Sequence, residues 1–144
     1  MKIINKKAGY EYQLTSDKYE AGIALLGAEA KSIRGRHLDL SQSTARILGG
    51  EAWLINANIP ILQPPQGYNS TRMRKLLLHK DQIVSISTKV KQQKLTIVPT
   101  SIYNMGRIYK VGLALGKPKR KFEKREYLKK KDIEREIQKE LKVH

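Results

Sequence analysis

The clearest helical pattern lies in HKDQIVSISTKVKQQK (79–94), where apolar side chains recur at the spacing of one helix face. Ile83, Ile86 and Val90 stand at i, i+3 and i+7, and the lysines fall mostly outside that stripe. A shorter pattern, GAEAKSIRGR (27–36), places Ala30 and Ile33 on one side. We therefore predict two short helices whose basic residues are turned to solvent.

The rest of the region between residues 10 and 115 reads mainly as strands. YEYQL (10–14) and EAGIALL (20–26) are short β-type runs separated by the polar TSDKY (15–19). Gly49-Gly50 predicts a hairpin turn, because a two-residue turn needs the positive φ values that glycine adopts readily. A second hairpin is expected at 104–106, between KLTIVPTSIY and RIYKVGLAL, whereas the prolines of PILQPPQGYNSTRMR (60–74) indicate a loop.

Five or six strands in hairpins, broken by two short helices, predict a mainly β protein. An oligonucleotide-binding (OB) type antiparallel β-barrel fits this length and strand order best. The composition changes after Gly116, so we expect a barrel over residues 1–116 and a basic C-terminal tail over 117–144. The distal tail carries Ile133, Ile137 and Leu141 at i, i+4 and i+8. A lone helix is marginal in water, so the tail is expected to be helical or partly disordered and to order on a partner.

Charge narrows the choice of partner. The chain has 29 lysines and arginines against 13 acidic residues, a formal net charge of +16. Such an excess favours polyanions through counterion release, which leaves RNA, DNA and an anionic membrane surface as candidates. The sequence has no cysteine, no apolar leader segment and no apolar run of the ~18 residues that a membrane span needs. We therefore expect a soluble, cytoplasmic protein, and a monomer.

The sequence offers little for catalysis. His37, His79 and His144 are scattered and have no acidic partners at metal-ligand spacing, so neither a metal nor another cofactor is expected. GLALGK (112–117) lacks the spacing and the Ser or Thr of a phosphate-binding loop, and no serine-nucleophile motif occurs. These observations predict a binding module, not an enzyme.

Three basic clusters are candidates for anion binding. In KPKRKFEKREYLKKKD (117–132), Phe122 lies among cations, which suits stacking on a nucleobase while the cations meet phosphates. A solvated charge run with Phe122 packed on the barrel is about equally compatible with the residues. The few bulky apolar residues there make a weak membrane face. The other clusters are TRMRKLLLHK, which also reads as a core strand with a basic rim, and NKKAGYEY.

The order of NKKAGYEY, YEAGIALLGAEAKSIR, TRMRKLLLHKDQI, LTIVPTSIY and KFEKRE resembles the SmpB family, the SsrA-binding proteins of bacterial trans-translation. The resemblance runs from Asn5 to about Lys131. It implies an OB-type barrel that binds the tRNA-like domain of tmRNA and delivers it to stalled ribosomes. It also implies a tail that enters the mRNA channel near the small-subunit decoding centre.

The resemblance and the basic clusters together assign residues to these two roles. For tmRNA they are Asn5, Lys6, Lys7, Glu20, Lys31, Arg34, Arg72, Arg74, Lys75, Leu77 and His79. For the ribosome they are Phe122, Glu123, Lys124 and Arg125, with Phe122 where the family usually has His or Tyr.

Other departures are Gly9 and Tyr10, where Arg-His is usual, and Pro118 near a tail glycine position. The alternatives are a structural ribosomal protein or another OB-fold RNA-binding protein, and a nuclease is a third hypothesis.

Overall fold

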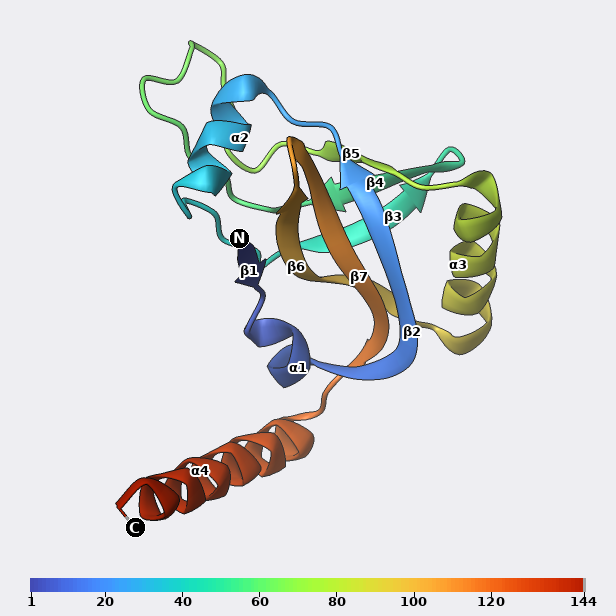
Figure 1. Ribbon diagram of the computed structural model, residues 1–144. Helices are drawn as coiled ribbons and strands as arrows, with labels where there is room; N and C mark the ends of the chain where they lie inside the picture. Colours follow the sequence, from blue (N-terminus) through green and yellow to red (C-terminus); the bar gives the residue numbers. More distant parts are fainter. Residues whose placement is uncertain (144) are drawn as a thin grey trace.

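The computed structural model describes residues 1–143 and consists of a β-barrel from which one helix extends (Figure 1). The strands are β1 (Lys2–Ile4), β2 (Tyr12–Ile23), β3 (Thr44–Leu48), β4 (Glu51–Ile55), β5 (Arg74–Leu77), β6 (Thr96–Met105) and β7 (Ile108–Pro118). The helices are α1 (Lys7–Glu11), α2 (Gly27–Arg34), α3 (Lys80–Gln93) and α4 (Lys121–Val143). The expectation of a mainly β protein with short helices and a helical C-terminal tail is confirmed.

The strands pair antiparallel and close on themselves. Their order is β1-β6-β3-β4-β5-β2-β7, and β7 also pairs with β6, so every strand except β1 belongs to a ring. Strands β3 and β6 pair through Ala45 and Ile97. Closure pairs backbone N–H and C=O groups that the edge strands of an open sheet would leave unpaired.

Both predicted hairpins are present. Gly49 and Gly50 have φ values of 60° and 76° between β3 and β4, the backbone that a primed turn requires. Gly106, with φ of 64°, turns the chain between β6 and β7. The segment GLALGK lies inside β7, as expected for the last part of a strand.

The N-terminal part of the chain differs from the prediction. YEYQL and EAGIALL are not two strands separated by a polar loop, because Tyr12–Ile23 forms one long strand. The polar residues between Leu14 and Lys18 are accommodated by a shift in the β2–β7 register. Strand β1 and helix α1 were not predicted, and the barrel with β1 has seven strands, not five or six. Three- and five-residue elements are too short to show a period in the sequence.

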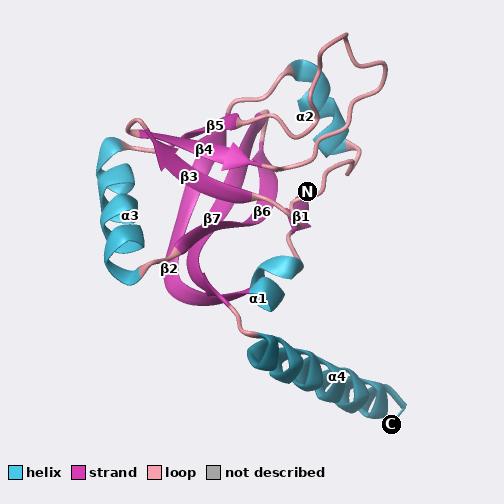
Figure 2. Ribbon diagram, turned by 180° about the vertical axis from the view of Figure 1, so that it is seen from behind, coloured by secondary structure: helices cyan, strands magenta, loops and turns pink. Residues whose placement is uncertain are grey.

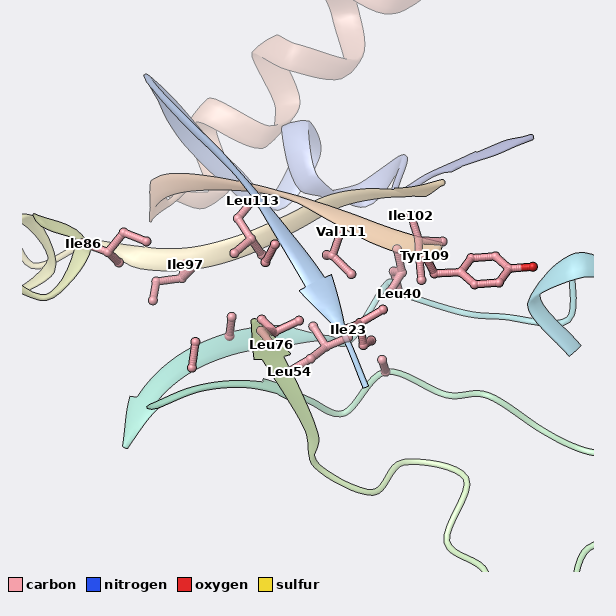
Figure 3. Close-up of a cluster of buried hydrophobic side chains, with 14 of the residues drawn as sticks. Ile23, Leu40, Leu54, Leu76, Ile86, Ile97, Ile102, Tyr109, Val111 and Leu113 are labelled. Carbon is pink, nitrogen blue, oxygen red and sulfur yellow. The ribbon is translucent and has the colours of Figure 1, made fainter. Parts of the chain in front are cut away.

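The core fills the barrel and is closed at its two ends by helices (Figure 3). Ile86, on the predicted stripe of α3, is buried at one end of the cluster beside Ile97. At the other end Tyr109 points toward α2, where its hydroxyl donates a hydrogen bond to the carbonyl oxygen of Ala30 (3.3 Å). Ile33 of α2 is also fully buried. The two helical stripes found in the sequence are thus the surfaces that plug the barrel.

Candidate nucleic-acid interface

One groove joins the ends of β2 and β5 to the start of α3. It has a volume of about 610 Å³ and is lined by Glu20, Lys75, Leu77, His79 and Lys110, among others. Leu77 and Gly22 are paired residues of β5 and β2, and an added Cβ at Gly22 would lie 3.3 Å from the Leu77 Cβ. Four residues assigned separately to RNA binding are therefore brought together on one surface.

The alternation of β5 explains why Leu77 is available there. Arg74 and Leu76 point inward and are buried, whereas Lys75 and Leu77 point outward. Leu77 is 57% exposed, although it is an apolar residue in the middle of the RKLLLH segment. The backbone N–H of His79 donates to Gln82 Oε1 (3.1 Å), which caps the start of α3, and the imidazole of His79 is exposed at the rim of the groove.

Glu20 is held as a carboxylate between two neighbours. The neighbouring Tyr103 hydroxyl, with help from the Lys110 charge, lowers the pKa of Glu20 against the opposing effect of burial. Lys110 Nζ lies 3.5 Å from Glu20 Oε1. Burial and the neighbouring carboxylate of Glu20 together raise the pKa of Tyr103 to about 12. Glu20 therefore presents an acceptor among cations, suited to a base amino group or a ribose hydroxyl.

A second group surrounds the buried carboxylate of Glu29 on α2. Arg74 donates to Glu29 Oε2 through Nε (2.9 Å) and Nη2 (2.6 Å). Arg72 donates to Oε2 through Nε (3.0 Å) and to Oε1 through Nη2 (2.5 Å). The Tyr68 hydroxyl donates to the Ile59 carbonyl oxygen (2.7 Å) and lies 3.0 Å from Glu29 Oε2. This network attaches the loop before β5 to α2.

The network corrects one assignment. Both Arg74 and Glu29 are 0% exposed, so the Arg74 side chain points into the protein and does not reach the surface where RNA would bind. The reason is the alternation of β5, which places Arg74 on the same side as Leu76. Arg72 keeps about a third of its side chain exposed, and Lys31 and Arg34 stand exposed on α2. These three residues remain candidates for phosphate contact.

The N-terminal candidates also divide into buried and exposed residues. Asn5 is buried, and its Nδ2 donates to the carbonyl oxygens of Leu40 (3.3 Å) and Pro99 (2.8 Å). Its side chain therefore joins the N-terminus to the barrel, and is not displayed for RNA. Lys6 and Lys7 are exposed where α1 begins.

The tail candidates lie in the first two turns of α4, which leaves the barrel beside α1 (Figure 2). Phe122 is 69% exposed and does not pack on the core. Lys124 Nζ forms an ion pair with Glu11 Oε2 (2.9 Å), which raises the pKa of Lys124. Glu123 and Arg125 are exposed, and Lys124 is half-buried. Farther along the helix, Ile133, Ile137 and Leu141 are exposed.

Three side chains of this surface were missed at the sequence level. Lys110 and Tyr103 hold Glu20 from β7 and β6, and Tyr127 packs against α1. The alternation of KVG in β7 places Lys110 outward, but its pairing with β2 could not be foreseen from spacing.

Within residues 1–143, no group of three or more metal-ligating side chains is positioned to hold an ion. None of the helices in that range is long and apolar enough to cross a membrane.

Comparison with known proteins agrees with this architecture. The family model described as SmpB protein matches residues 2–143. An SsrA-binding protein of Sulfurihydrogenibium sp. is 48% identical over 140 residues, covering 96% of this chain and 91% of the relative. One from Thermosipho melanesiensis is 45% identical over 147 residues, with 99% of each chain covered.

A solved structure described as "tmRNA-SmpB: a journey to the center of the bacterial ribosome" contains a similar chain. The TM-score is 0.67 at 39% identity, with 83% of this chain and 85% of that chain covered. The match of the family model to almost the whole sequence, together with these relatives, shows that the chain belongs to the SmpB family.

Proposed function

We propose that this protein is an RNA-binding adaptor of ribosome rescue. Its barrel binds the tRNA-like domain of tmRNA, and the complex is delivered to stalled ribosomes for trans-translation. The protein binds and positions RNA and performs no chemistry of its own. With the ribosome as its partner, its place of action is the cytoplasm, and it acts as a monomer.

The groove around Leu77 is the observation that carries the RNA-binding part of this proposal. The groove places the exposed Leu77 beside a carboxylate and several cations, so that one surface offers an apolar contact for a base or ribose together with cations for phosphates. Lys75 and Lys110 supply phosphate contacts beside it. A net charge of +16 adds the long-range attraction to RNA.

The tail supports the ribosomal part. Phe122 stands exposed on α4. Residues 117–131, which cover the end of β7, the linker and the first half of α4, hold nine basic residues against two acidic residues. An exposed ring flanked by cations can stack on a base while the cations contact phosphates. We place this ring and the adjacent Glu123, Lys124 and Arg125 at the decoding centre, with the helix in the mRNA channel.

A competition gel shift tests the barrel's part in this function. The protein should prefer the tRNA-like domain of tmRNA to an ordinary tRNA of equal length across a salt series. Replacing Leu77 with Ala should lower the affinity about tenfold, the equivalent of about 1–2 kcal/mol for lost stacking or apolar contact. Met105 is equally exposed on the β6–β7 hairpin, outside the groove, so Met105→Ala is the matched control and should have no effect.

Equal affinity for both RNAs would contradict the proposal and leave a general RNA-binding protein. Retention on ribosomes after a high-salt wash would favour a structural ribosomal component. Cleavage of the RNA in the presence of magnesium would indicate a nuclease.

A further inference from the structure

Helix α2 ends in a backbone conformation that is unusual for the residue that adopts it. Arg36, two residues beyond the helix, has φ of 64°, in the left-handed region that favours glycine. Its backbone N–H donates to the Ile33 carbonyl oxygen (2.9 Å), and the N–H of His37 donates to the Ser32 carbonyl oxygen (2.8 Å). These are the two bonds of a Schellman motif, in which glycine usually occupies the left-handed position. An arginine in that position is strained.

A glycine stands beside this position but does not occupy it. Gly35 has φ of −82°, which any residue can adopt. A Cβ added at Gly35 would lie 3.0 Å from Cδ2 of His37, so this glycine allows the close approach of the His37 ring. The strained position is left to Arg36, which is exposed and lies outside the hydrophobic core. Strain at an exposed charged residue points to a role outside the fold.

Arg36 extends a basic surface on α2. Lys31 and Arg34 are three residues apart, so they share one face of the helix, and both are exposed. Within residues 1–143, no acidic side chain forms an ion pair with Lys31, Arg34 or Arg36. The acidic residue of α2, Glu29, is buried and neutralised by two other arginines. The three cations at the end of this helix therefore lack a counter-ion in that part of the chain.

Helix α2 is firmly attached to the barrel. Ile33 is fully buried, and the buried carboxylate of Glu29 binds the loop before β5. Strand β2 ends at Ile23, next to the pair Gly22–Leu77 of the groove, and only residues 24–26 separate this strand from α2 (Figure 1). The basic surface is thus carried by a fixed element that is joined to the groove by a short connection.

We propose that Arg36 binds a phosphate of the RNA together with Lys31 and Arg34, so that the end of α2 is a second part of the RNA-binding surface beside the groove around Leu77. Arginine suits this role because its planar guanidinium group can donate two parallel hydrogen bonds to phosphate oxygens. The bound phosphates supply the counter-ions for the three cations. The identity of the RNA, the tRNA-like domain of tmRNA, rests on the proposed function.

Substitutions at Arg36 separate the effect of the charge from that of the backbone. Arg36→Gly removes the charge and the strain, so it should raise the melting temperature by about 3 °C. It should also lower the affinity for the tRNA-like domain about fivefold, the loss expected for one exposed ion pair. Arg36→Ala should lower the affinity equally without raising the melting temperature, because the strain remains. Arg36→Lys should keep the affinity within about twofold, since lysine still binds phosphate as a point charge.

Lys94 provides the matched control. It is exposed and has φ of 52° at the C-terminal cap of α3, so Lys94→Gly also removes one charge and the strain of one left-handed residue. Helix α3 closes the opposite end of the core from α2 (Figure 3). Lys94→Gly should therefore raise the melting temperature by a similar amount and leave the affinity for RNA unchanged.

Titrations between about 50 and 200 mM salt count the phosphate contacts. In Arg36→Gly, the slope of the logarithm of affinity against the logarithm of salt concentration should become shallower by about 0.7–0.9, the value for one contact. In Lys94→Gly the slope should not change. Equal effects of the two variants would overturn the proposal, because the net charge alone would then explain them.

Two other results would also overturn it. One is an unchanged affinity in Arg36→Gly, and the other is a lower melting temperature in that variant, which would mean that Arg36 serves the fold. The proposed function fails separately, if the wild-type protein binds the tRNA-like domain and an ordinary tRNA equally well. The comparison of Arg36→Gly with Lys94→Gly on either RNA then still decides whether Arg36 contacts phosphate.

Discussion

Glu29 shows how much of this structure depends on a single carboxylate. Its two oxygens accept hydrogen bonds from both arginines of the TRMR segment and from the backbone N–H of Leu26 (2.8 Å). Among the described residues, no buried side-chain nitrogen or oxygen lacks a hydrogen-bond partner. Arg74 can therefore be fully buried, because its charge is neutralised and its donors are occupied.

Glu29→Gln should strongly destabilise the protein. The substitution leaves the Arg74 charge buried without a counter-ion, and breaking a buried pair in this way costs about 3–5 kcal/mol. The free energy of unfolding measured in urea at neutral pH checks this. Glu51, whose pair with Lys75 is exposed, is the matched control, and Glu51→Gln should change that free energy by less than about 1 kcal/mol.

The same carboxylate predicts acid sensitivity. Burial raises the pKa of Glu29, but the hydrogen bonds from Arg72, the Leu26 N–H and Arg74 outweigh it and lower the pKa to about 2. The pKa in the unfolded chain is the ordinary 4.5. The stabilisation is therefore complete above about pH 4.5 and is lost as the pH falls toward 2. The free energy of unfolding measured in urea should therefore be lower at pH 3 than at pH 6. This difference between the two pH values should be smaller in Glu29→Gln.

Phe122 gives a prediction on the ribosomal side. Replacing Phe122 with Ala should weaken the interaction with the ribosome by about 1–3 kcal/mol if the ring stacks on a base. Phe122→Tyr keeps the ring and should restore binding. Tagging of stalled peptides is the readout, and an unchanged level in the alanine variant would favour a simple solvated helix face.

At the level of elements, local patterns identified most of the fold. The stripe of α3, the Gly49-Gly50 turn and the strands of both hairpins were correctly predicted, because each has a periodicity or a backbone requirement visible within a few residues. Strand β1 is stabilised by pairing with β6, and helix α1 by contacts with β2, β6 and α4. Of these, β6 and α4 lie far away in the sequence. Their own residues carry no comparable pattern.

The tail helix should be separable from tmRNA binding. Strand β7 continues to Pro118, beyond the expected boundary at residue 116, so removal should begin at Lys121. The shortened protein should keep its affinity for the tRNA-like domain within about threefold, because the groove around Leu77 remains intact, and it should lose peptide tagging. Gel shifts and a tagging assay measure the two effects. If the truncation lowers RNA affinity as much as Leu77→Ala does, both the tail and the barrel contribute to RNA binding.

For the molecule as a whole, the excess of positive charge predicts strongly salt-dependent binding. The logarithm of the affinity for RNA should fall linearly with the logarithm of the salt concentration, because bound cations are released from the RNA. Removing the tail from Lys121 should make the slope for an unspecific RNA shallower, since basic residues of α4 are lost. Titrations between about 50 and 200 mM salt measure this. Identical slopes would mean that the tail does not contact RNA outside the ribosome.

The amino-acid sequence determined the charge, the hairpins, the helical stripes and, through its resemblance, the family. These features arise from residues that are neighbours along the chain. The tertiary structure decided that Arg74 and Asn5 are buried, that Glu20, Lys75, Leu77 and His79 share one groove, and that Lys119 contacts α1. The reason is distance along the chain: Arg74 meets Glu29 45 residues away, and Lys119 meets Gly9 110 residues away. Only the closed barrel brings such partners together.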